Sequence, residues 1–529
     1  MSRRRAVLAA LAATALGAGA GQLAGLALDP GTGPVDVVAE RVVALTPPAV
    51  AELATVGAGL GSRTTVVAGV LVVLALVAAL AGAVSGRSER PGMWLLAGTG
   101  VLAVLGALTA PGAGQLDPLP SAVALLVAVT MFRRLHRLAR RIPAPTAQGT
   151  LPDGRPMRES LTRRRFLRSS ALAGAGGIVA GTGAAWGAPR LPSGRIGEAR
   201  TALTARLDAL AGEGRIARAA TVPAGAGFPG GTAFTTPVAD FYRIDTALRL
   251  PAVDPDGWRL RVHGMVEREL ELTLDDVLRR PLVERWVTLA CVSNEVGGDL
   301  VSTTRFTGIE LAPLLAAAGP DPAADQVLST SADGWTAGSP SQIVLDPARG
   351  ALLAVGMDGA ALPVEHGFPA RLVVPGLYGY VSATKWVTGI ELTTFAQRQD
   401  YWRVRGWAPP GPMETASRID APGPYARVPA GPVTVTGTAF AVPRGISRVE
   451  VGVDGDDGNV VWTDAELAPV PAGGVTWRMW RCVLDLPPGG YTLWCRATDG
   501  DGAVQTGQVR SPLPGAATGW DSRSVTVVG

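Results

Sequence analysis

The N-terminal part of the chain alternates long apolar runs with arginine-rich segments. Uncharged apolar residues fill four runs, 6–28, 64–84, 93–110 and 119–132. The first three approach the roughly 20 residues that span a bilayer core. The fourth is shorter, but we count it as a span because the arginines after it would otherwise lie outside, against the tendency of basic loops to stay in the cytoplasm. The pattern predicts a four-helix membrane anchor over residues 1–135.

Residues 136–190 combine an arginine-rich loop with another uncharged segment. The sequence TRRRFLR at 162–168 precedes a Gly/Ala-rich stretch, 169–187. This order resembles an internal twin-arginine export signal, although the same arginines also suit the cytoplasmic flank of a plain fifth span. Both interpretations give five spans that begin inside the cell and place the residues after 190 on the extracytoplasmic face. Whether the fifth span is cleaved stays open.

Two further features of this region bear on its function. Residues 35–60 are apolar but are interrupted by Pro47, Pro48 and Glu52, which favours an interfacial helix. The four spans contain no His or Cys that could ligate haem, and no charge of the kind that marks a transport path. We therefore expect an anchor in the lipid bilayer, or a docking surface, rather than a pump.

Beyond the membrane part, mixed periodicities predict an α+β domain. Leu203, Leu207 and Leu210 have helical spacing, so residues 191–220 are expected to form an amphipathic linker. Strand-like and short helical runs then alternate through 221–410, which is typical of an α+β fold. The strand-like runs cover 258–266 and 371–376, and the helical runs cover 274–278 and 309–319.

Residues 411–529 follow a proline-rich junction and are expected to form a β-sandwich. Apolar alternation between Gly, Pro and Asp turns has the spacing of an immunoglobulin-like domain. Cys482 and Cys495 are equidistant from the turn at 487–490, so a hairpin centred there would place them opposite each other. Both a cross-strand disulfide and two buried thiols are open.

Composition narrows the function classes. Hydrophobic residues make up 47% of the chain and charged residues only 17%, which is not typical of a wholly soluble protein. The net charge of +4 is no argument for nucleic acid, because the basic surplus lies in the membrane part and the remainder is acidic. Three cysteines exclude a four-cysteine iron–sulfur cluster within one chain, and no C-x-x-C-H haem site is present.

Cys291 is the remaining cysteine and the best candidate for chemistry. It lies in TLACVSN, residues 288–294, where an apolar strand enters a polar, Gly-rich loop. From the residues alone, a structural thiol and a metal ligand are both reasonable.

The exported part resembles the sulfite oxidase superfamily of mononuclear molybdenum enzymes. The matching segments are FYRID (241–245), TLACVSN (288–294), SADGWT (331–336), HGFPARLVVPGLYGYVSATKW (366–386), QDYW (399–402), WRMW (477–480) and RATD (496–499). They occur in the family's order across residues 225–525. The resemblance implies a sulfite oxidase fold over 221–410 and a molybdenum–molybdopterin cofactor.

The resemblance also implies roles for individual residues. The Cys291 thiolate would ligate molybdenum, with Arg243 and Tyr401 as further catalytic residues. Cofactor-binding roles fall to Arg243, Asp245, Cys291, Ser293, Asn294, Asp333, His366, Arg371, Ser382 and Lys385. Lys385 is the only lysine of the chain, which suits a site that needs a compact ammonium group.

For several of these residues, a purely structural or incidental role is the alternative. Lys385 could be incidental, and His366 could be a structural histidine in its Gly/Pro loop. Tyr401 could pack at the domain junction together with Trp402. His263, on a predicted strand, is assigned no role.

Two departures from the family pattern concern the substrate. Sulfite-oxidising members carry arginines after the cysteine motif, where this chain has Glu295 and Val296. Sulfite is therefore not the expected substrate. Asp245 stands where those members have a histidine.

Together these patterns predict a membrane-anchored molybdopterin-dependent oxidoreductase. It would act by oxygen-atom transfer on a small extracytoplasmic substrate, with a separate electron carrier and a possible homodimer formed through the sandwich. Two alternatives stay open. One is a metal-independent cysteine acyl-transferase that uses Cys291 and His366. The other is a non-catalytic surface binding protein built on the sandwich.

Overall fold

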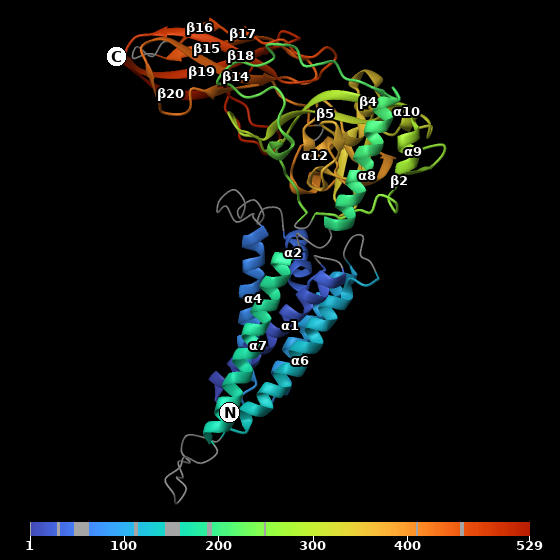
Figure 1. Ribbon diagram of the computed structural model, residues 1–529, viewed down its shortest axis with the longest axis vertical. Helices are drawn as coiled ribbons and strands as arrows, with labels where there is room; N and C mark the ends of the chain where they lie inside the picture. The colour runs from blue at the N-terminus through green and yellow to red at the C-terminus, as the bar shows by residue number, and fades with distance from the viewer. Residues whose placement is uncertain are drawn as a thin grey trace, which may run out of the picture. The chain divides into compact units, whose positions relative to one another are not determined.

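The computed structural model describes residues 2–28, 32–46, 63–109, 115–142, 159–187, 193–247, 250–408, 411–454 and 460–529. The chain divides into two compact units (Figure 1). The first comprises 1–197 with 247–250, and the second comprises 198–246 with 251–529. We describe each unit by itself.

The first unit is helical. Its helices are α1 (Arg3–Leu28), α2 (Pro34–Leu45), α4 (Arg63–Val84), α5 (Arg90–Leu108), α6 (Pro118–Arg140) and α7 (Glu159–Gly187). Among the described residues, α1, α4, α5 and α6 are long and apolar enough to cross a membrane, as the four predicted spans require. The predicted fifth span forms the continuous helix α7 but is not among these four. The predicted interfacial helix begins as α2, whereas Pro47, Pro48 and Glu52 lie outside the described residues.

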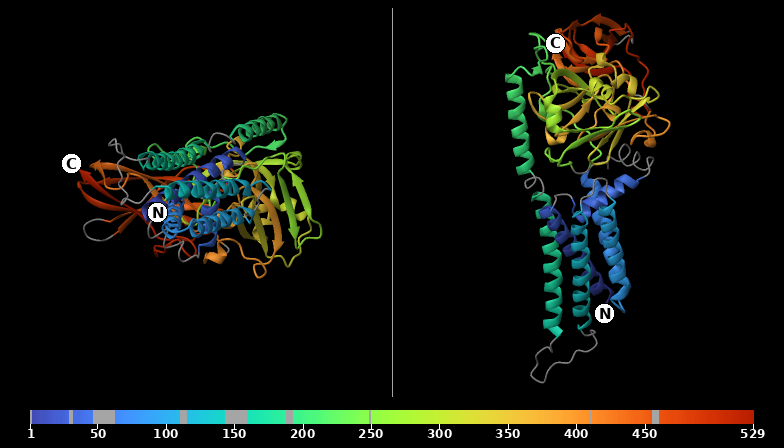
Figure 2. Two further views of the ribbon diagram at one scale, coloured as in Figure 1. Left: turned by 90° about the horizontal axis from the view of Figure 1, so that it is seen from below. Right: turned by 90° about the vertical axis from the view of Figure 1, so that its right-hand side faces the viewer.

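Small residues bring these helices close together. Helix α1 runs beside α6 and α7, as the views in Figures 1 and 2 agree. A Cβ atom at Gly19 of α1 would lie 2.3 Å from the carbonyl oxygen of Gly177 in α7, and one at Gly177 would lie 2.2 Å from that of Ala15. Such backbone contacts are typical of helix packing in membranes. They also explain why α7 joins the bundle although its apolar content is lower.

The outward surface of α4 and α5 is apolar. Large hydrophobic side chains are exposed along both helices: Leu71, Val72, Val73, Leu76, Leu80, Trp94, Leu102, Leu105 and Leu108. A helix bundle in water normally turns charged and polar side chains outward. The surface of these two helices is therefore of the kind that lipid covers.

The predicted amphipathic helix is α8 (Ser193–Gly212), most of which, from residue 198 on, belongs to the second unit. Leu203, Leu207 and Leu210 are buried, as their spacing predicts. The Thr204 hydroxyl accepts a hydrogen bond from the backbone N–H of Ala361 at 3.0 Å. The helix thus packs on the edge of the adjoining sheet.

Two mixed sheets and short helices form the α+β part, as the alternating runs predict. The first sheet has the order β1 (Ile216–Ala217), β4 (Leu282–Ala290), β5 (Val301–Glu310), β8 (Leu352–Met357), β10 (Arg371–Val373), with β9 (Ala360–Ala361) paired to β8. The second has the order β3 (Leu270–Thr273), β2 (Arg259–Gly264), β11 (Val387–Thr393), β6 (Gln326–Ser331), β7 (Thr336–Pro340). The helices are α9 (Leu274–Arg279), α10 (Leu311–Ala316), α11 (Ser341–Val344) and α12 (Gly379–Ser382).

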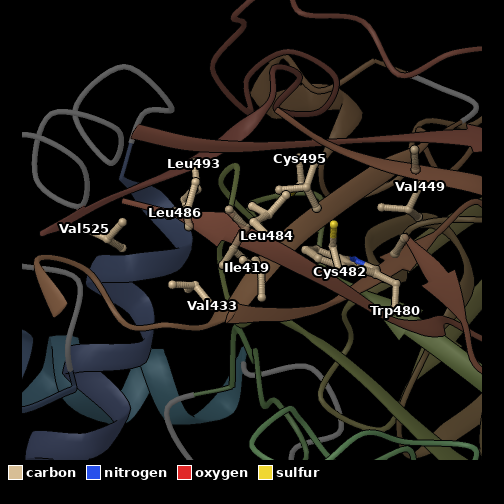
Figure 3. Close-up of a cluster of buried hydrophobic side chains, with 14 of the residues drawn as sticks. Ile419, Val433, Val449, Trp480, Cys482, Leu484, Leu486, Leu493, Cys495 and Val525 are labelled. Atoms are coloured by element: carbon tan, nitrogen blue, oxygen red, sulfur yellow. The ribbon is translucent and has the colours of Figure 1, made fainter. Parts of the chain in front are cut away.

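The C-terminal part is a sandwich of two sheets. One has the order β12 (Ala416–Ala421), β14 (Gly431–Phe440), β18 (Arg478–Leu486), β17 (Glu466–Leu467). The other has the order β13 (Ala426–Pro429), β20 (Asp521–Val528), β19 (Gly489–Asp499), β15 (Ile446–Asp454), β16 (Val460–Asp464). Buried side chains from both sheets, among them Val449, Trp480 and Leu484, share one core (Figure 3). An immunoglobulin-like topology stays a prediction.

The predicted hairpin that pairs Cys482 with Cys495 is wrong. Cys482 on β18 lies opposite Val435, whereas Cys495 on β19 lies between Val451 and Asp521 in the other sheet. Symmetric spacing about a turn cannot tell a hairpin from a connection that crosses between facing sheets, and here the chain crosses. Both cysteines are free and buried in the shared core (Figure 3).

Candidate active site

A pocket in the second unit gathers most of the predicted site residues. They come from segments far apart in the chain: Cys291 follows β4, Ser331 ends β6, Arg371 begins β10 and Lys385 precedes β11. The pocket is lined by Phe241, Tyr242, Ile244, Asp245, Thr246, Cys291, Val292, Ser293, Ser331, Asp333, Trp335, His366, Arg371, Gly379, Tyr380, Ala383, Lys385, Trp386, Trp402 and Trp407.

Cys291 is held at the start of the loop between β4 and β5. Its backbone N–H donates to the Leu300 carbonyl at 2.9 Å, which extends the ladder of the two strands past their ends. Asn294 fixes the loop, because its Oδ1 accepts the Leu300 N–H at 2.8 Å and its own N–H donates to the Cys291 carbonyl at 3.1 Å. Asn294 thus acts on the loop's shape and does not line the pocket.

The Cys291 thiol is almost shielded from solvent and is surrounded by hydrogen-bond donors. Cys291 is 8% exposed, and burial raises the pKa of its thiol. The backbone N–H and hydroxyl of Ser293, together with the Val292 N–H, donate toward the sulfur and oppose that rise in pKa. Donors of this kind stabilise a thiolate. Because burial outweighs these donors, the free thiol stays protonated and would lose its proton on binding a metal, where the donors would stabilise the thiolate.

Asp245 joins two cations at the pocket. Lys385 Nζ donates to one Asp245 oxygen and to the backbone carbonyls of Ile244 and Glu365, both at 3.2 Å. Arg243 Nε donates to the other Asp245 oxygen at 2.6 Å. The segment FYRID and the only lysine of the chain thus meet in space, as the resemblance implies.

Arg371 brings a buried positive charge to the pocket. Its guanidinium donates to the carbonyls of His366 at 3.2 Å and Ala383 at 3.4 Å, and lies over the Phe306 ring. Burial lowers the pKa of Arg371 to about 10, which leaves it charged at neutral pH. Burial and the Arg371 charge lower the pKa of His366 to about 4, so its imidazole is neutral.

Four predicted residues lie outside the pocket lining: Arg243 and Asn294, described above, and Ser382 and Tyr401. The Ser382 hydroxyl donates to the Tyr378 carbonyl at 2.9 Å, within the short helix α12. Tyr401 packs edge to face on Trp402 and lies under the Arg405 guanidinium, 3.6 Å from the ring centroid. The packing interpretation of Tyr401 therefore agrees with its contacts. Asp333, by contrast, lines the pocket, and its carboxylate accepts the Trp335 N–H at 3.1 Å.

No role was predicted from the sequence for one tyrosine that lines the pocket beside Cys291. Tyr242 lines the pocket, and a Cβ atom at Gly379 would lie 3.4 Å from its hydroxyl. Burial raises the pKa of Tyr242, and the neighbouring Cys291 raises it further. Its position inside FYRID, directly before Arg243, was the available signal. Four aromatic residues of the pocket wall were also not singled out for this site: Trp335, Tyr380, Trp402 and Trp407.

The pocket fits a cofactor with a pterin ring and a phosphate. Among the residues that the structure describes, three that line the pocket carry a buried polar atom with no hydrogen-bond partner: Ser331 Oγ, Trp335 Nε1 and Arg371 Nε. An unpaired buried group costs about 1–3 kcal/mol, so such atoms point to a ligand that pairs with them. These donors suit a heterocycle edge, the nearby cations suit a phosphate, and the thiol suits a soft metal.

Comparisons with known proteins agree with this donor set. The family model described as "Oxidoreductase molybdopterin binding domain" matches residues 247–402. Mitochondrial sulfite oxidase of Macaca fascicularis is 31% identical over 331 residues, covering 53% of this chain and 57% of that protein. Sulfite oxidase of Gallus gallus is 30% identical over 343 residues, covering 55% of this chain and 71% of that protein.

A solved structure is also similar. The sulfane dehydrogenase SoxCD from Paracoccus pantotrophus aligns with a TM-score of 0.47 and 24% identity, covering 56% of this chain and 84% of that one. The chain spans little more than half the length of the mitochondrial sulfite oxidases it matches.

The family match and the pocket chemistry together identify the cofactor as molybdenum–molybdopterin. The similarity to the Gallus gallus enzyme extends over most of that protein and carries the assignment beyond the matched domain. The chain belongs to the sulfite oxidase family of molybdopterin-binding oxidoreductases.

Proposed function

We propose that this chain is a membrane-anchored molybdenum oxidoreductase that transfers an oxygen atom to or from a small extracytoplasmic substrate and exchanges electrons with a separate carrier. The observation that carries the proposal is the Cys291 thiol, placed in a pocket beside buried cations and unpaired polar atoms. When bound, the cofactor supplies the two-electron redox chemistry. The protein positions it and controls its surroundings.

The residues of the pocket divide this work. Cys291 Sγ would bind molybdenum, with the donors from Ser293 stabilising its negative charge. Arg371, Lys385 and the Ser331 hydroxyl would hold the phosphate and the pterin edge. Tyr242, whose raised pKa keeps its hydroxyl protonated, would donate a hydrogen bond beside the reacting centre.

The wall of the pocket favours a substrate without net negative charge. Tyr380, Trp402 and Trp407 form an aromatic cluster, with ring centroids 5.7 Å and 5.9 Å apart. The cations that line the pocket, Arg371 and Lys385, already contact backbone carbonyls or Asp245. Because a phosphate would engage the same two charges, little positive charge would remain for an anion.

The first unit supports the membrane part of the proposal. Four helices have the length and composition to cross a membrane, and the exposed surface of α4 and α5 is apolar. Five spans that begin inside would carry the pocket to the outer face.

The contacts do not favour the acyl-transferase alternative. A cysteine nucleophile needs a base that lowers the pKa of its thiol. Here burial raises the pKa of Cys291 and lowers that of His366, and His366 packs edge to face on Phe241. No hydrogen bond joins His366 to Cys291 in the part of the chain that the structure describes.

Metal analysis tests the proposal. Protein made with cofactor biosynthesis should contain molybdenum in equimolar amount, and Cys291→Ser should lose the activity while the unfolding temperature stays close to that of the wild type. A turnover assay should then compare an uncharged sulfoxide and an N-oxide with sulfite and nitrate. Metal-free protein whose Cys291 is stoichiometrically acylated by a substrate analogue would instead support acyl transfer.

A further inference from the structure

The loop that follows Cys291 rests directly on the β-sandwich. Arg418 Nη1, from β12, donates to the Gly298 carbonyl at 2.7 Å. Gly297 has a φ of +74°, and a Cβ atom there would lie 2.4 Å from Asp521 Oδ1. Only glycine can bring the loop this close to the carboxylate. The loop and the sandwich are therefore fitted to each other at two consecutive residues.

The sandwich side of this contact is itself fixed. Arg418 pairs with Asp420 at 2.7 Å, and its side chain is only 15% exposed. Asp521 is 4% exposed and accepts bonds from the Ile419 N–H at 2.8 Å and from Arg523 at 2.6 Å. The hydrogen bonds and ion pairs of Arg418 and Asp521 leave this contact little freedom, although Asp420 Oδ2 is buried without a partner among the described residues.

The strand that leads to Cys291 is held by the sandwich as well. The Trp477 N–H donates to Thr288 Oγ1 at 2.7 Å, and the Thr288 N–H donates to the Val475 carbonyl at 3.0 Å. The indole of Trp477, 1% exposed, donates to the Phe234 carbonyl at 2.8 Å. The sandwich thus contacts the chain on both sides of the cysteine.

We infer that the β-sandwich is a positioning element for the Cys291 sulfur: Arg418 and Asp521 fix the loop after it, and Trp477 fixes the strand before it. These are positioning residues, since none of them lines the pocket. The inference rests on the proposed function in one respect: that function explains why the thiol is positioned, since it would bind a metal. The placement of the sulfur can be measured without turnover.

Ser293 connects the contact between loop and sandwich to the Cys291 sulfur. Its N–H and hydroxyl donate toward the sulfur, and it lies on the loop that Arg418 and Gly297 hold against the sandwich. A shift of that loop would withdraw these donors and open the thiol to solvent. The sandwich therefore controls both the position and the accessibility of Cys291.

A pair of glycine variants separates positioning from general strain. Gly297→Ala and Gly502→Ala both place an alanine at positive φ, +74° and +88°. Only the first meets a neighbour, because nothing lies within 4 Å of a Cβ atom at Gly502. In full-length protein made without cofactor biosynthesis, Gly297→Ala should raise the rate of iodoacetamide labelling at Cys291 about fivefold or more. Gly502→Ala should leave that rate unchanged.

A second set of variants tests the hydrogen bond from Arg418 to the Gly298 carbonyl. Arg418→Ala should also accelerate labelling of Cys291, and Arg418→Lys, which keeps one donor for the Gly298 carbonyl, should restore part of the protection. Arg496→Ala is the control, because Arg496 pairs with Glu450 in the same sandwich without touching the loop. In the holoenzyme, the Gly297→Ala and Arg418→Ala variants should lose molybdenum, whereas both controls should retain it.

Each result of these experiments either supports or contradicts a positioning role of the sandwich. Equal labelling in Gly297→Ala and Gly502→Ala, with equal losses of unfolding temperature, would mean that the sandwich only stabilises the fold. If Gly297→Ala does not fold, the labelling of Arg418→Ala against Arg496→Ala decides instead. Accelerated labelling in a chain that never binds molybdenum would uphold positioning and reject the proposed function.

Discussion

Arg371 and His366 lie together in the pocket, where the guanidinium donates to the backbone carbonyl of the histidine at 3.2 Å. Burial and this positive charge lower the pKa of His366 to about 4, so the imidazole is neutral in the folded protein. It can exchange hydrogen bonds with a cofactor, but it adds no charge to a site that already holds buried cations.

The lowered pKa of His366 predicts a loss of stability in acid. The unfolded chain binds the proton near pH 6.5 and the folded chain only near pH 4, so stability falls as the pH falls through this window. The full effect is about 3 kcal/mol. Urea unfolding of wild type and His366→Gln at pH 7 and pH 4.5 should show a smaller loss in the variant. Equal losses would mean that other groups carry the acid sensitivity.

Removing the Arg371 charge should uncouple cofactor retention from folding. Arg371→Met keeps the length of the side chain but deletes a buried cation that has an unpaired Nε. Replacing a buried charge with an apolar group often costs little stability. We expect the unfolding temperature to stay near the wild-type value while molybdenum content falls at least tenfold, roughly 1.4 kcal/mol of binding free energy. Arg261→Met, at an exposed pair with Glu269, should retain the metal.

Two tyrosine variants test which tyrosine is catalytic: Tyr242, which lines the pocket, or Tyr401, which the resemblance implied. Tyr242→Phe removes the hydroxyl that lies beside Gly379 in the pocket, whereas Tyr401→Phe changes a residue that packs outside its lining. We expect Tyr242→Phe to lower kcat about tenfold or more with unchanged molybdenum content, and Tyr401→Phe to have little effect. A larger loss in Tyr401→Phe would restore the role that the resemblance implied.

Glycine variants in α7 test whether this helix stays in the bundle. A Cβ atom at Gly177 would meet the Ala15 carbonyl at 2.2 Å, whereas one at Gly174 meets nothing within 4 Å. Gly177→Val should therefore reduce the yield and unfolding temperature of detergent-extracted protein, and Gly174→Val should not. Similar behaviour of the two variants, or a mature protein that lacks residues 159–187, would mean that α7 is not a permanent part of the bundle.

The sequence predicted those parts of the fold that local pattern determines. Apolar runs of bilayer length marked α1, α4, α5 and α6, and leucines at helical spacing marked α8. Whether two consecutive strands form a hairpin or enter facing sheets depends on long-range packing, and this is why the predicted pairing of Cys482 with Cys495 was wrong.

The residues of the site likewise fall into two groups, those that the sequence predicted and those that it did not. Cys291, Asp245, His366, Arg371 and Lys385 belong to recognisable segments, and the fold brings them to one pocket. Trp335 and Trp402 also belong to recognised segments, whereas Trp407 lies outside them and no spacing in the chain places it in the pocket wall. The contacts of Arg418 and Trp477 with the neighbourhood of Cys291 join residues more than a hundred positions apart.

The two cysteines of the sandwich have a consequence for how the protein matures. All three cysteines are free thiols, and Cys482 and Cys495 help to fill a core that closes without a covalent link. The second unit can thus reach its final fold in a reducing compartment. Insertion of the pterin there would not have to wait for oxidation of these thiols.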